Sequence, residues 1–211
     1  FNIPEDKIVV TYLGTDYMNI VGSMPKIDIK DKKYILFTGN RSIYKNFFTF
    51  LIAVSEILKN NSELFLICTG PEFNDIELRW LRDLNVENKV LSYFCKDDSE
   101  LVYLYKNAEC FVFPSLYEGF GIPLLEAFAC NCPVVSSPGG SLKEIAGDAA
   151  VYFDPKNIKE MRNSIKSVLT DAKLRNDLIS AGTKRLEYFS WNKCRKETNL
   201  VYDNVIKNIY S

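Results

Sequence analysis

The chain has 211 residues, of which 47% are apolar, and 26 basic residues nearly balance 27 acidic ones. This length suffices for one large domain or two small ones with a buried core, and a formal net charge of −1 argues against a general nucleic-acid-binding protein. The sequence contains no histidine, which excludes a histidine general base within these residues and argues against a zinc site.

Short apolar runs alternate with amphipathic stretches along the chain. The runs predict strands at residues 8–12, 34–38, 64–68, 89–93, 110–114, 133–136 and 149–153. Helical patterns predict helices at residues 46–59, 75–83, 99–106, 123–130, 141–146, 158–169, 172–188 and 192–209. The strand runs are continuous rather than alternating, which is typical of strands covered on both faces. We therefore expect an α/β domain with a doubly wound, mostly parallel sheet and helices on both faces.

No apolar run approaches the length of a membrane span, so we expect no membrane-spanning segment within these residues. The six cysteines lie mostly inside apolar runs and lack the spacing of a redox pair or a zinc site. We expect them to be buried free thiols in a reducing compartment.

Polar and glycine-containing segments follow several of the predicted strands. In an open α/β sheet, ligands bind at the carboxyl ends of the strands. The segments that should meet at this edge are residues 39–45, 69–72, 94–98, 114–121 and 137–141.

One segment with two carboxylates is the most informative part of the chain. Glu118 and Glu126 lie eight residues apart, and Pro123 between them predicts the first position of a helix. The N–H groups of Leu124 and Leu125 are then expected to point out of the helix end, where the dipole favours an anion. We expect Glu126 on the first turn, where the dipole alone also favours an acid, and Glu118 in the preceding loop without a local partner.

Gly119 and Gly121 flank the turn before this helix, and glycine lets backbone approach a ligand closely. The segment thus offers hydrogen-bond donors for a diphosphate and carboxylates for sugar hydroxyls. A nucleotide-sugar site needs both.

Arg41 and Lys45 follow the strand predicted at residues 34–38. Both side chains can reach a diphosphate, Arg41 as a planar fork and Lys45 as a point charge. Taken alone, the pair is better explained as solvated loop cations, and only the neighbouring helix end favours phosphate binding.

Two further loops have structural as well as functional interpretations. Ser141 followed by Glu144 predicts a capping box, which by itself explains both residues. Residues 94–98 could present backbone groups to a nucleobase, or they could be a plain loop in which Asp98 caps the next helix.

Taken together, these motifs resemble the C-terminal half of the group-1 (family 4) retaining glycosyltransferases, which have the two-domain GT-B fold. The most specific part is PSLYEGFG followed by LLEA, the E-x7-E signature formed by Glu118 and Glu126. The other segments that carry the resemblance are residues 7–10, 14–16, 39–46, 68–71, 133–135, 144–150 and 189–191. The pattern departs from the family at Asn131 and Cys132, and at Phe94 or Cys95 in place of a glycine.

The resemblance implies roles for individual residues. Glu118 would face the donor sugar near the reacting carbon, while Arg41 and Lys45 would neutralise the diphosphate leaving group. Glu126 would hold the ribose hydroxyls. Phe94 and Cys95 would flank the base. Further donor contacts are expected from Gly39, Gly119, Phe120, Gly121, Leu124 and Leu125.

The implied reaction is transfer of a hexose, with retention, from a UDP-, GDP- or dTDP-linked donor to a glycan or lipid-linked acceptor. No cofactor or metal is expected, because cations and a helix end would stabilise the departing diphosphate. By the same resemblance, residues 1–33 are an interdomain linker with the strand that enters the domain, residues 34–190 bind the donor, and residues 191–211 form a C-terminal crossover helix. An N-terminal domain would bind the acceptor and is absent from this chain.

The implied location is the cytoplasm, with at most peripheral association with the inner membrane face through the missing domain. Part of the apolar stripe on the last helix, formed by Leu200, Val201, Val205, Ile206 and Ile209, would then be exposed in this chain. Two other functions share the fold: a non-catalytic nucleotide-sugar-binding subunit, and a sugar-nucleotide epimerase. The epimerase would need acid and base residues beyond those in this histidine-free chain.

Overall fold

A six-stranded sheet forms the centre of the computed structural model, which describes residues 3–210, with side chains described up to residue 207. The strand order is β3-β2-β1-β4-β5-β6, and every pairing is parallel. The strands are β1 (Lys33–Phe37), β2 (Leu64–Thr69), β3 (Val90–Tyr93), β4 (Cys110–Phe113), β5 (Val134–Ser136) and β6 (Ala150–Tyr152). The predicted doubly wound parallel fold is therefore confirmed.

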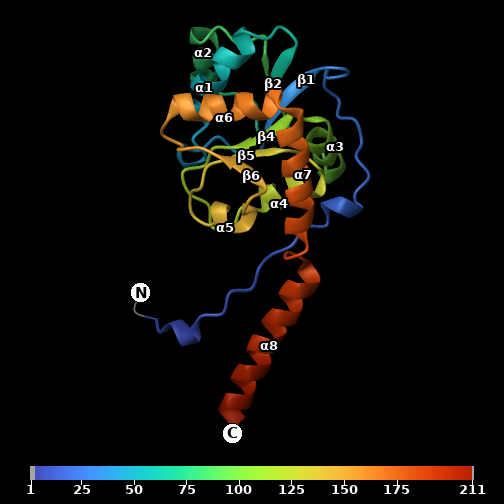
Figure 1. Cartoon of the computed structure of the whole chain (residues 1–211), viewed down its shortest axis with the longest axis vertical. Coiled ribbons are helices and arrows are strands. Elements are labelled where there is room, and N and C mark those ends of the chain that lie inside the picture. The colour runs from blue at the N-terminus through green and yellow to red at the C-terminus, as the bar shows by residue number, and fades with distance from the viewer. Residues whose placement is uncertain (1–2, 211) are drawn as a thin grey trace.

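Helices cover both faces of the sheet (Figure 1). One face is covered by α1 (Phe47–Lys59), α2 (Asp75–Asp83) and α6 (Ile158–Thr170). The other is covered by α3 (Asp98–Asn107), α4 (Ile122–Ala129) and α5 (Leu142–Ala146), with α7 (Ala172–Leu186) packed on α4. Successive β1 residues alternate between the two cores, Ile35 on one side and Tyr34 on the other, which explains why the strand is apolar throughout.

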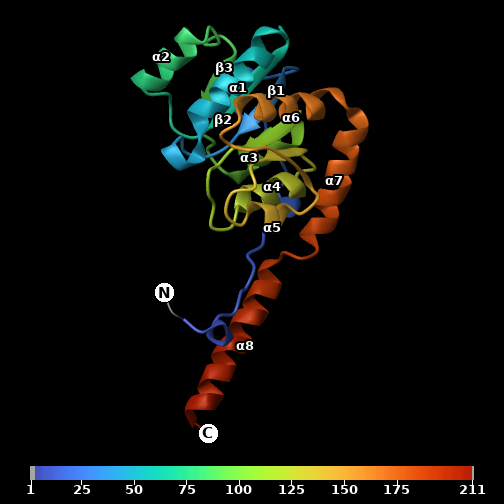
Figure 2. The same ribbon diagram turned by 60° about the vertical axis from the view of Figure 1, so that its left-hand side comes forward.

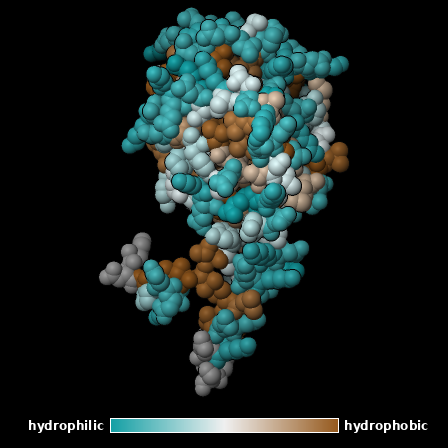
Figure 3. Space-filling view, in the orientation of Figure 1, coloured by the Kyte–Doolittle hydropathy of each residue, from teal (hydrophilic) through white to brown (hydrophobic). Residues whose placement is uncertain are grey.

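A stalk projects from this body. It consists of α8 (Trp191–Tyr210) and the N-terminal segment, which lie near each other below the sheet in two views (Figures 1 and 2). Hydrophobic residues gather on the stalk (Figure 3), including Val9, Val10, Leu200 and Val205, all more than half exposed. The predicted exposure of the α8 stripe is confirmed for Leu200, Val205 and Ile206; Val201 is half-buried, and the Ile209 side chain lies outside the described residues.

The strand predicted at residues 8–12 is wrong. These residues form no regular secondary structure and pair with no strand among the described residues, and Val9 and Val10 are 60% and 65% exposed. Two short 3-10 helices flank these residues, η1 (Glu5–Lys7) before them and η2 (Tyr17–Asn19) after them. The other predicted strands and helices are present with ends shifted by two residues or fewer.

The cysteines are all free thiols, and Cys68, Cys110, Cys130 and Cys132 are buried as predicted. Among the described helices, none has both the length and the apolar character that crossing a membrane requires.

Candidate functional site

The loops after β1, β4 and β5 meet at the carboxyl edge of the sheet. The backbone N–H of Leu116, after β4, donates to the carbonyl of Tyr44, after β1, at 2.7 Å. The backbone N–H of Ser141, after β5, donates to the carbonyl of Glu118 at 3.2 Å. Segments far apart in the sequence thus form one surface, as the parallel topology predicts.

Lys45 and Glu118 form an ion pair on this surface. Nζ of Lys45 lies 2.7 Å from Oε1 of Glu118, and the two side chains are only 11% and 14% exposed. The Ser115 hydroxyl donates to the same carboxylate oxygen at 2.7 Å. The prediction that Glu118 lacks a local partner is therefore wrong, because a residue three positions earlier and a cation from another loop both bind it.

The loop after β5 holds the backbone around Glu118. The Ser141 hydroxyl donates to the Phe120 carbonyl at 2.9 Å, and Ser137 donates to the Ser115 carbonyl. Gly140 has a φ of +65°, and a Cβ there would lie 2.2 Å from the Glu118 carbonyl oxygen, so only glycine fits. The capping box predicted for Ser141 is absent, because this residue is itself in the helical region and its hydroxyl bonds to the Glu118 loop.

Helix α4 begins one residue earlier than predicted. Gly121 precedes it with a φ of +97°, Ile122 is its first residue and Pro123 its second. Glu126 consequently lies beyond the first turn. The Leu124 N–H is not free, since it donates to the Gly121 carbonyl at 2.9 Å.

Arg41 turns away from Glu118 into the interior. Its Nε lies 2.7 Å from Oε1 of Glu77, with side chains only 3% and 5% exposed, and its Nη2 donates to the carbonyls of Pro71 and Glu72 at 2.6 and 2.9 Å. The guanidinium also lies 4.7 Å from the Phe73 ring centroid. Nη1 is buried and has no hydrogen-bond partner among the described residues. In this arrangement the Arg41 side chain clamps the loop after β2 to the loop after β1, and its predicted contact with a diphosphate stays a prediction.

Glu126 lies in a largely buried, polar environment. Oε2 accepts a hydrogen bond from Tyr105 at 3.1 Å. Burial raises the pKa of the Glu126 carboxyl to about 7, and the Asp98 charge acts in the same direction, whereas the Tyr105 hydrogen bond opposes it. Tyr17, from the N-terminal segment, donates to Asp98 at 3.0 Å.

Glu126 lines a pocket of about 310 Å³ at the junction of the body and the stalk. The other lining residues are Gly14, Thr15, Asp16, Tyr17, Ile20, Asp98, Ile122 and Trp191.

The loop after β3 has one exposed and one half-buried residue of interest. Phe94 is 74% exposed and contributes to an open groove of about 480 Å³ beside Phe73 and Leu78. Burial raises the pKa of the Cys95 thiol to about 12, so this cysteine is a neutral, unreactive group near pH 7. Asp97 rather than Asp98 caps α3, accepting from the N–H groups of Ser99 and Glu100.

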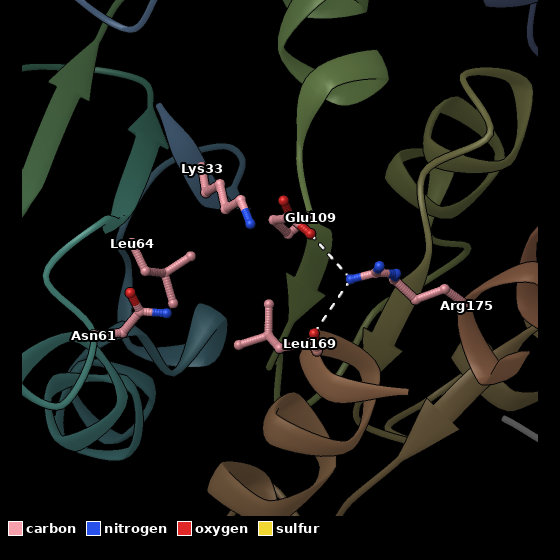
Figure 4. Close-up of a pocket in the computed structure, with 6 residues that line it drawn as sticks. All are labelled: Lys33, Asn61, Leu64, Glu109, Leu169 and Arg175. Carbon is pink, nitrogen blue, oxygen red and sulfur yellow. Dashed lines mark hydrogen bonds and ion pairs between the residues drawn. The ribbon is translucent and has the colours of Figure 1, made fainter. Parts of the chain in front are cut away.

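A separate cavity of about 210 Å³ lies at the opposite, amino edge of the sheet (Figure 4). Lys33, Glu109 and Arg175 line it, and Arg175 donates to Glu109 at 3.0 Å. None of the predicted site residues lies there.

Comparison with known proteins identifies the family. The family model for glycosyl transferases group 1 matches residues 23–185, most of the chain. The chain belongs to the group 1 glycosyltransferases.

Two curated relatives illustrate this membership, and one solved structure shares the fold. O-antigen chain mannosyltransferase B of Escherichia coli is 32% identical over 96% of the chain and 56% of its own length. N-acetylgalactosamine-N,N'-diacetylbacillosaminyl-diphospho-undecaprenol 4-alpha-N-acetylgalactosaminyltransferase of Campylobacter jejuni is 31% identical over 93% of the chain and 54% of its own length. Anabaena Alr3699/HepE, solved in complex with UDP and glucose, has the same fold, with a TM-score of 0.79 and 17% identity over 97% of this chain and 58% of its own. The chain therefore spans about half the length of these relatives.

Of the site residues predicted for this glycosyltransferase, the structure brings together Lys45 and Glu118. Gly119 is exposed with open space where a Cβ would point, and Gly39 is also exposed, with a φ of +99°. Arg41 pairs with Glu77 instead, and Glu126 and Phe94 line separate pockets.

Sequence reasoning missed the residues that support the site. Glu77 carried a usable signal, because Asn74 followed by Glu77 three residues later is a capping-box pattern, and the structure contains that box. Ser115 and Tyr105 carried none, since nothing in the spacing indicates that their hydroxyls reach Glu118 and Glu126.

Proposed function

We propose that this chain is the donor-binding half of a retaining glycosyltransferase that moves a hexose from a nucleoside-diphosphate sugar to a glycan or lipid-linked acceptor. The observation that carries the proposal is the Lys45–Glu118 pair, held at the carboxyl edge of the sheet. Three residues after Glu118, Gly121 opens helix α4. A cation, a carboxylate and a helix N-terminus in one place match the needs of a donor sugar and its diphosphate.

The leaving group gains negative charge as the sugar–phosphate bond breaks. Lys45 and the positive end of α4 would stabilise that charge, so the proposed reaction needs no metal. Glu118 would face the sugar, whose transition state resembles an oxocarbenium ion, and the open backbone at Gly119 would let sugar hydroxyls come close.

The rest of the donor would lie along the same edge. Glu126 would accept hydrogen bonds from the ribose hydroxyls, since its carboxylate lines a pocket and Tyr105 donates to its Oε2. Phe94 and Cys95 would flank the base, and Phe120, Gly121, Leu125 and Gly39 would complete the surroundings. Arg41 would act indirectly, by fixing the loop that carries Lys45.

The printed names of the relatives guide the choice of donors and acceptors to test. They include transferases of mannose and of N-acetylgalactosamine, so UDP-, GDP- and dTDP-linked hexoses and their N-acetylamino derivatives are the donors to screen. We place the acceptor site in a further part of the protein, and the reaction at the cytoplasmic face of the membrane where such glycans are assembled. Because closure of two domains would complete the site, the isolated chain should bind donor weakly and transfer nothing.

Two measurements test this function. Calorimetric titration of the chain with UDP, GDP and dTDP should give saturable binding to one of them, weakened in Lys45→Met and unchanged in Lys159→Met, an exposed lysine on α6. The complete protein should then transfer the sugar with retention. Release of an epimerised nucleotide-sugar would instead support the epimerase alternative, and binding without any turnover would support the non-catalytic subunit.

A further inference from the structure

Two chain segments join the body to the stalk, and they contact each other. One is the end of the N-terminal segment, residues 12–20, and the other is the turn from α7 into α8, residues 189–191 (Figures 1 and 2). Gly14 approaches Trp191 so closely that a Cβ on Gly14 would lie 2.3 Å from the Trp191 backbone nitrogen. The two connections therefore form a single junction, and a change in the orientation of the stalk would act on the body there.

The ring of Phe120 lies in the same junction. Its centroid is 6.3 Å from the Tyr12 ring and 6.0 Å from the Phe189 ring, and these two rings are 5.4 Å apart. The Phe120–Phe189 and Tyr12–Phe189 pairs are edge-to-face, a favoured aromatic geometry. Tyr12 is anchored further by a 2.6 Å hydrogen bond from its hydroxyl to Glu144.

The backbone of Phe120, in contrast, belongs to the donor loop. Phe120 is the second residue after Glu118, and its carbonyl accepts the Ser141 hydrogen bond that fixes this loop. Phe120 thus has its main chain in the donor loop and its side chain in contact with both stalk connections.

A second set of contacts joins the same elements. Tyr17 donates to Asp98, the first residue of α3. Gly14, Tyr17 and Trp191 line one pocket together with Glu126. The junction therefore adjoins both carboxylates of the site, through Phe120 near Glu118 and directly beside Glu126.

We propose that Phe120 is a positioning residue whose ring, packed against both Tyr12 and Phe189, couples occupancy of the donor site to the body–stalk junction. The inference rests on the proposed function, since it assumes that a nucleoside diphosphate occupies the loop around Glu118. A bound nucleotide orders the Glu118–Gly121 loop and so fixes the position of the Phe120 ring. The ring in turn contacts Tyr12 and Phe189, one from each connection. Because such coupling is reciprocal, a stalk orientation that keeps the Phe120 ring packed on Tyr12 and Phe189 increases the affinity for the donor.

Hydrogen exchange on the 211-residue chain, with and without saturating UDP or GDP, tests this coupling, and calorimetry measures binding separately. Coupling of ordinary strength corresponds to an effect of about fivefold or more, so exchange of the amides at residues 189–194 should slow by at least that factor on nucleotide binding. Phe120→Leu, compared at a nucleotide concentration that saturates this variant, should reduce the effect to less than about twofold. Tyr12→Leu should do the same from the N-terminal segment, which lies outside the sheet and keeps an apolar side chain at this position.

Two variants serve as controls. Tyr12→Phe keeps the ring and removes only the Glu144 hydrogen bond, so it should retain the exchange response. Phe48→Leu removes an aromatic contact of α1 with Trp80, whose rings are 5.1 Å apart, and should also retain it.

The outcomes separate the two claims. Nucleotide binding with no change at residues 189–194, or a full response in both Phe120→Leu and Tyr12→Leu, overturns the coupling and leaves the donor site standing. Failure of every nucleoside diphosphate to bind the unsubstituted chain overturns the proposed function, and the coupling with it.

Discussion

Replacing Arg41 by methionine distinguishes a structural clamp from a phosphate ligand. The substitution leaves the Glu77 carboxylate buried without its cation, and it removes the donor to the carbonyls of Pro71 and Glu72. Breaking a buried ion pair by removing one partner costs about 3–5 kcal/mol, because the remaining charge is uncompensated. With side chains 3% and 5% exposed, this pair belongs to the buried class. We expect Arg41→Met to lower the free energy of unfolding by about 3–5 kcal/mol.

Urea unfolding followed by tryptophan fluorescence measures this change, and Trp80 on α2 reports close to the clamp. The double variant Arg41→Met/Glu77→Gln should recover most of the lost stability, because the buried charge is gone and glutamine can preserve the capping box with Asn74. Arg79→Met, an exposed arginine on α2, is the matched control and should leave stability unchanged within error.

Nucleotide binding completes the test. If Arg41 acts only by fixing the loop, Arg41→Met should bind UDP or GDP more weakly as well as being less stable. The double variant should then recover nucleotide affinity together with stability. An Arg41→Met chain of unchanged stability that has lost diphosphate binding would refute the clamp and return Arg41 to the set of ligands.

Further predictions concern the site itself. Lys45→Met should lower kcat of the complete enzyme by about 10²–10³-fold, the usual loss for one preorganised charge-stabilising group, measured with the preferred donor. Glu118→Gln should abolish most turnover while calorimetry detects unchanged nucleotide binding; unimpaired turnover would remove Glu118 from the mechanism. Gly140→Ala should displace the Glu118 loop, because its Cβ would lie 2.2 Å from the Glu118 carbonyl oxygen, and should lower kcat more than stability. Since the Glu126 pKa is raised to about 7, the ionised fraction of this carboxyl grows about tenfold from pH 6 to 8, and affinity for a ribonucleoside diphosphate should rise with it. Glu126→Gln should remove this pH-dependent rise in affinity. A 2′-deoxy nucleotide, whose phosphates titrate in the same way, should show a smaller rise.

The same carboxyl also affects stability with pH. Its pKa is higher in the folded chain than the ordinary value of 4.5, so the unfolded chain ionises first as pH rises. Stability should therefore fall by about 3 kcal/mol between pH 4.5 and 7, a loss that Glu126→Gln should abolish when urea unfolding is repeated across this range. A difference of less than about 1 kcal/mol between the two chains would contradict the environment assigned to Glu126.

The sheet was predictable because its strands are buried on both faces. A run such as Leu64–Thr69 has no other stable environment in a chain of this size, and the glycine and polar segments that follow such runs end up at one edge by topology alone. Residues 8–12 are also rich in β-branched and aromatic residues, but they have no neighbouring strand among the described residues, and Val9 and Val10 are mostly exposed. An apolar run alone therefore does not establish that a segment belongs to the sheet.

The site was predictable only in part, because spacing does not fix the direction of a side chain. Arg41 and Lys45 lie four residues apart in one loop, yet one pairs with Glu77 in the interior and the other with Glu118. Both carboxylates lie far from the loop in sequence, so local patterns hold no information on which cation each will bind. Ser141 illustrates the same limit, since a capping pattern was overridden by two nearby carbonyls from the loop after β4.

The most direct test of the account is a structure of this chain with its preferred nucleoside diphosphate bound. The account predicts the β-phosphate at Lys45 Nζ and the start of α4, with the ribose hydroxyls on Glu126. A ligand bound instead in the cavity between Lys33 and Arg175 at the amino edge, with the Lys45–Glu118 pair untouched, would contradict it.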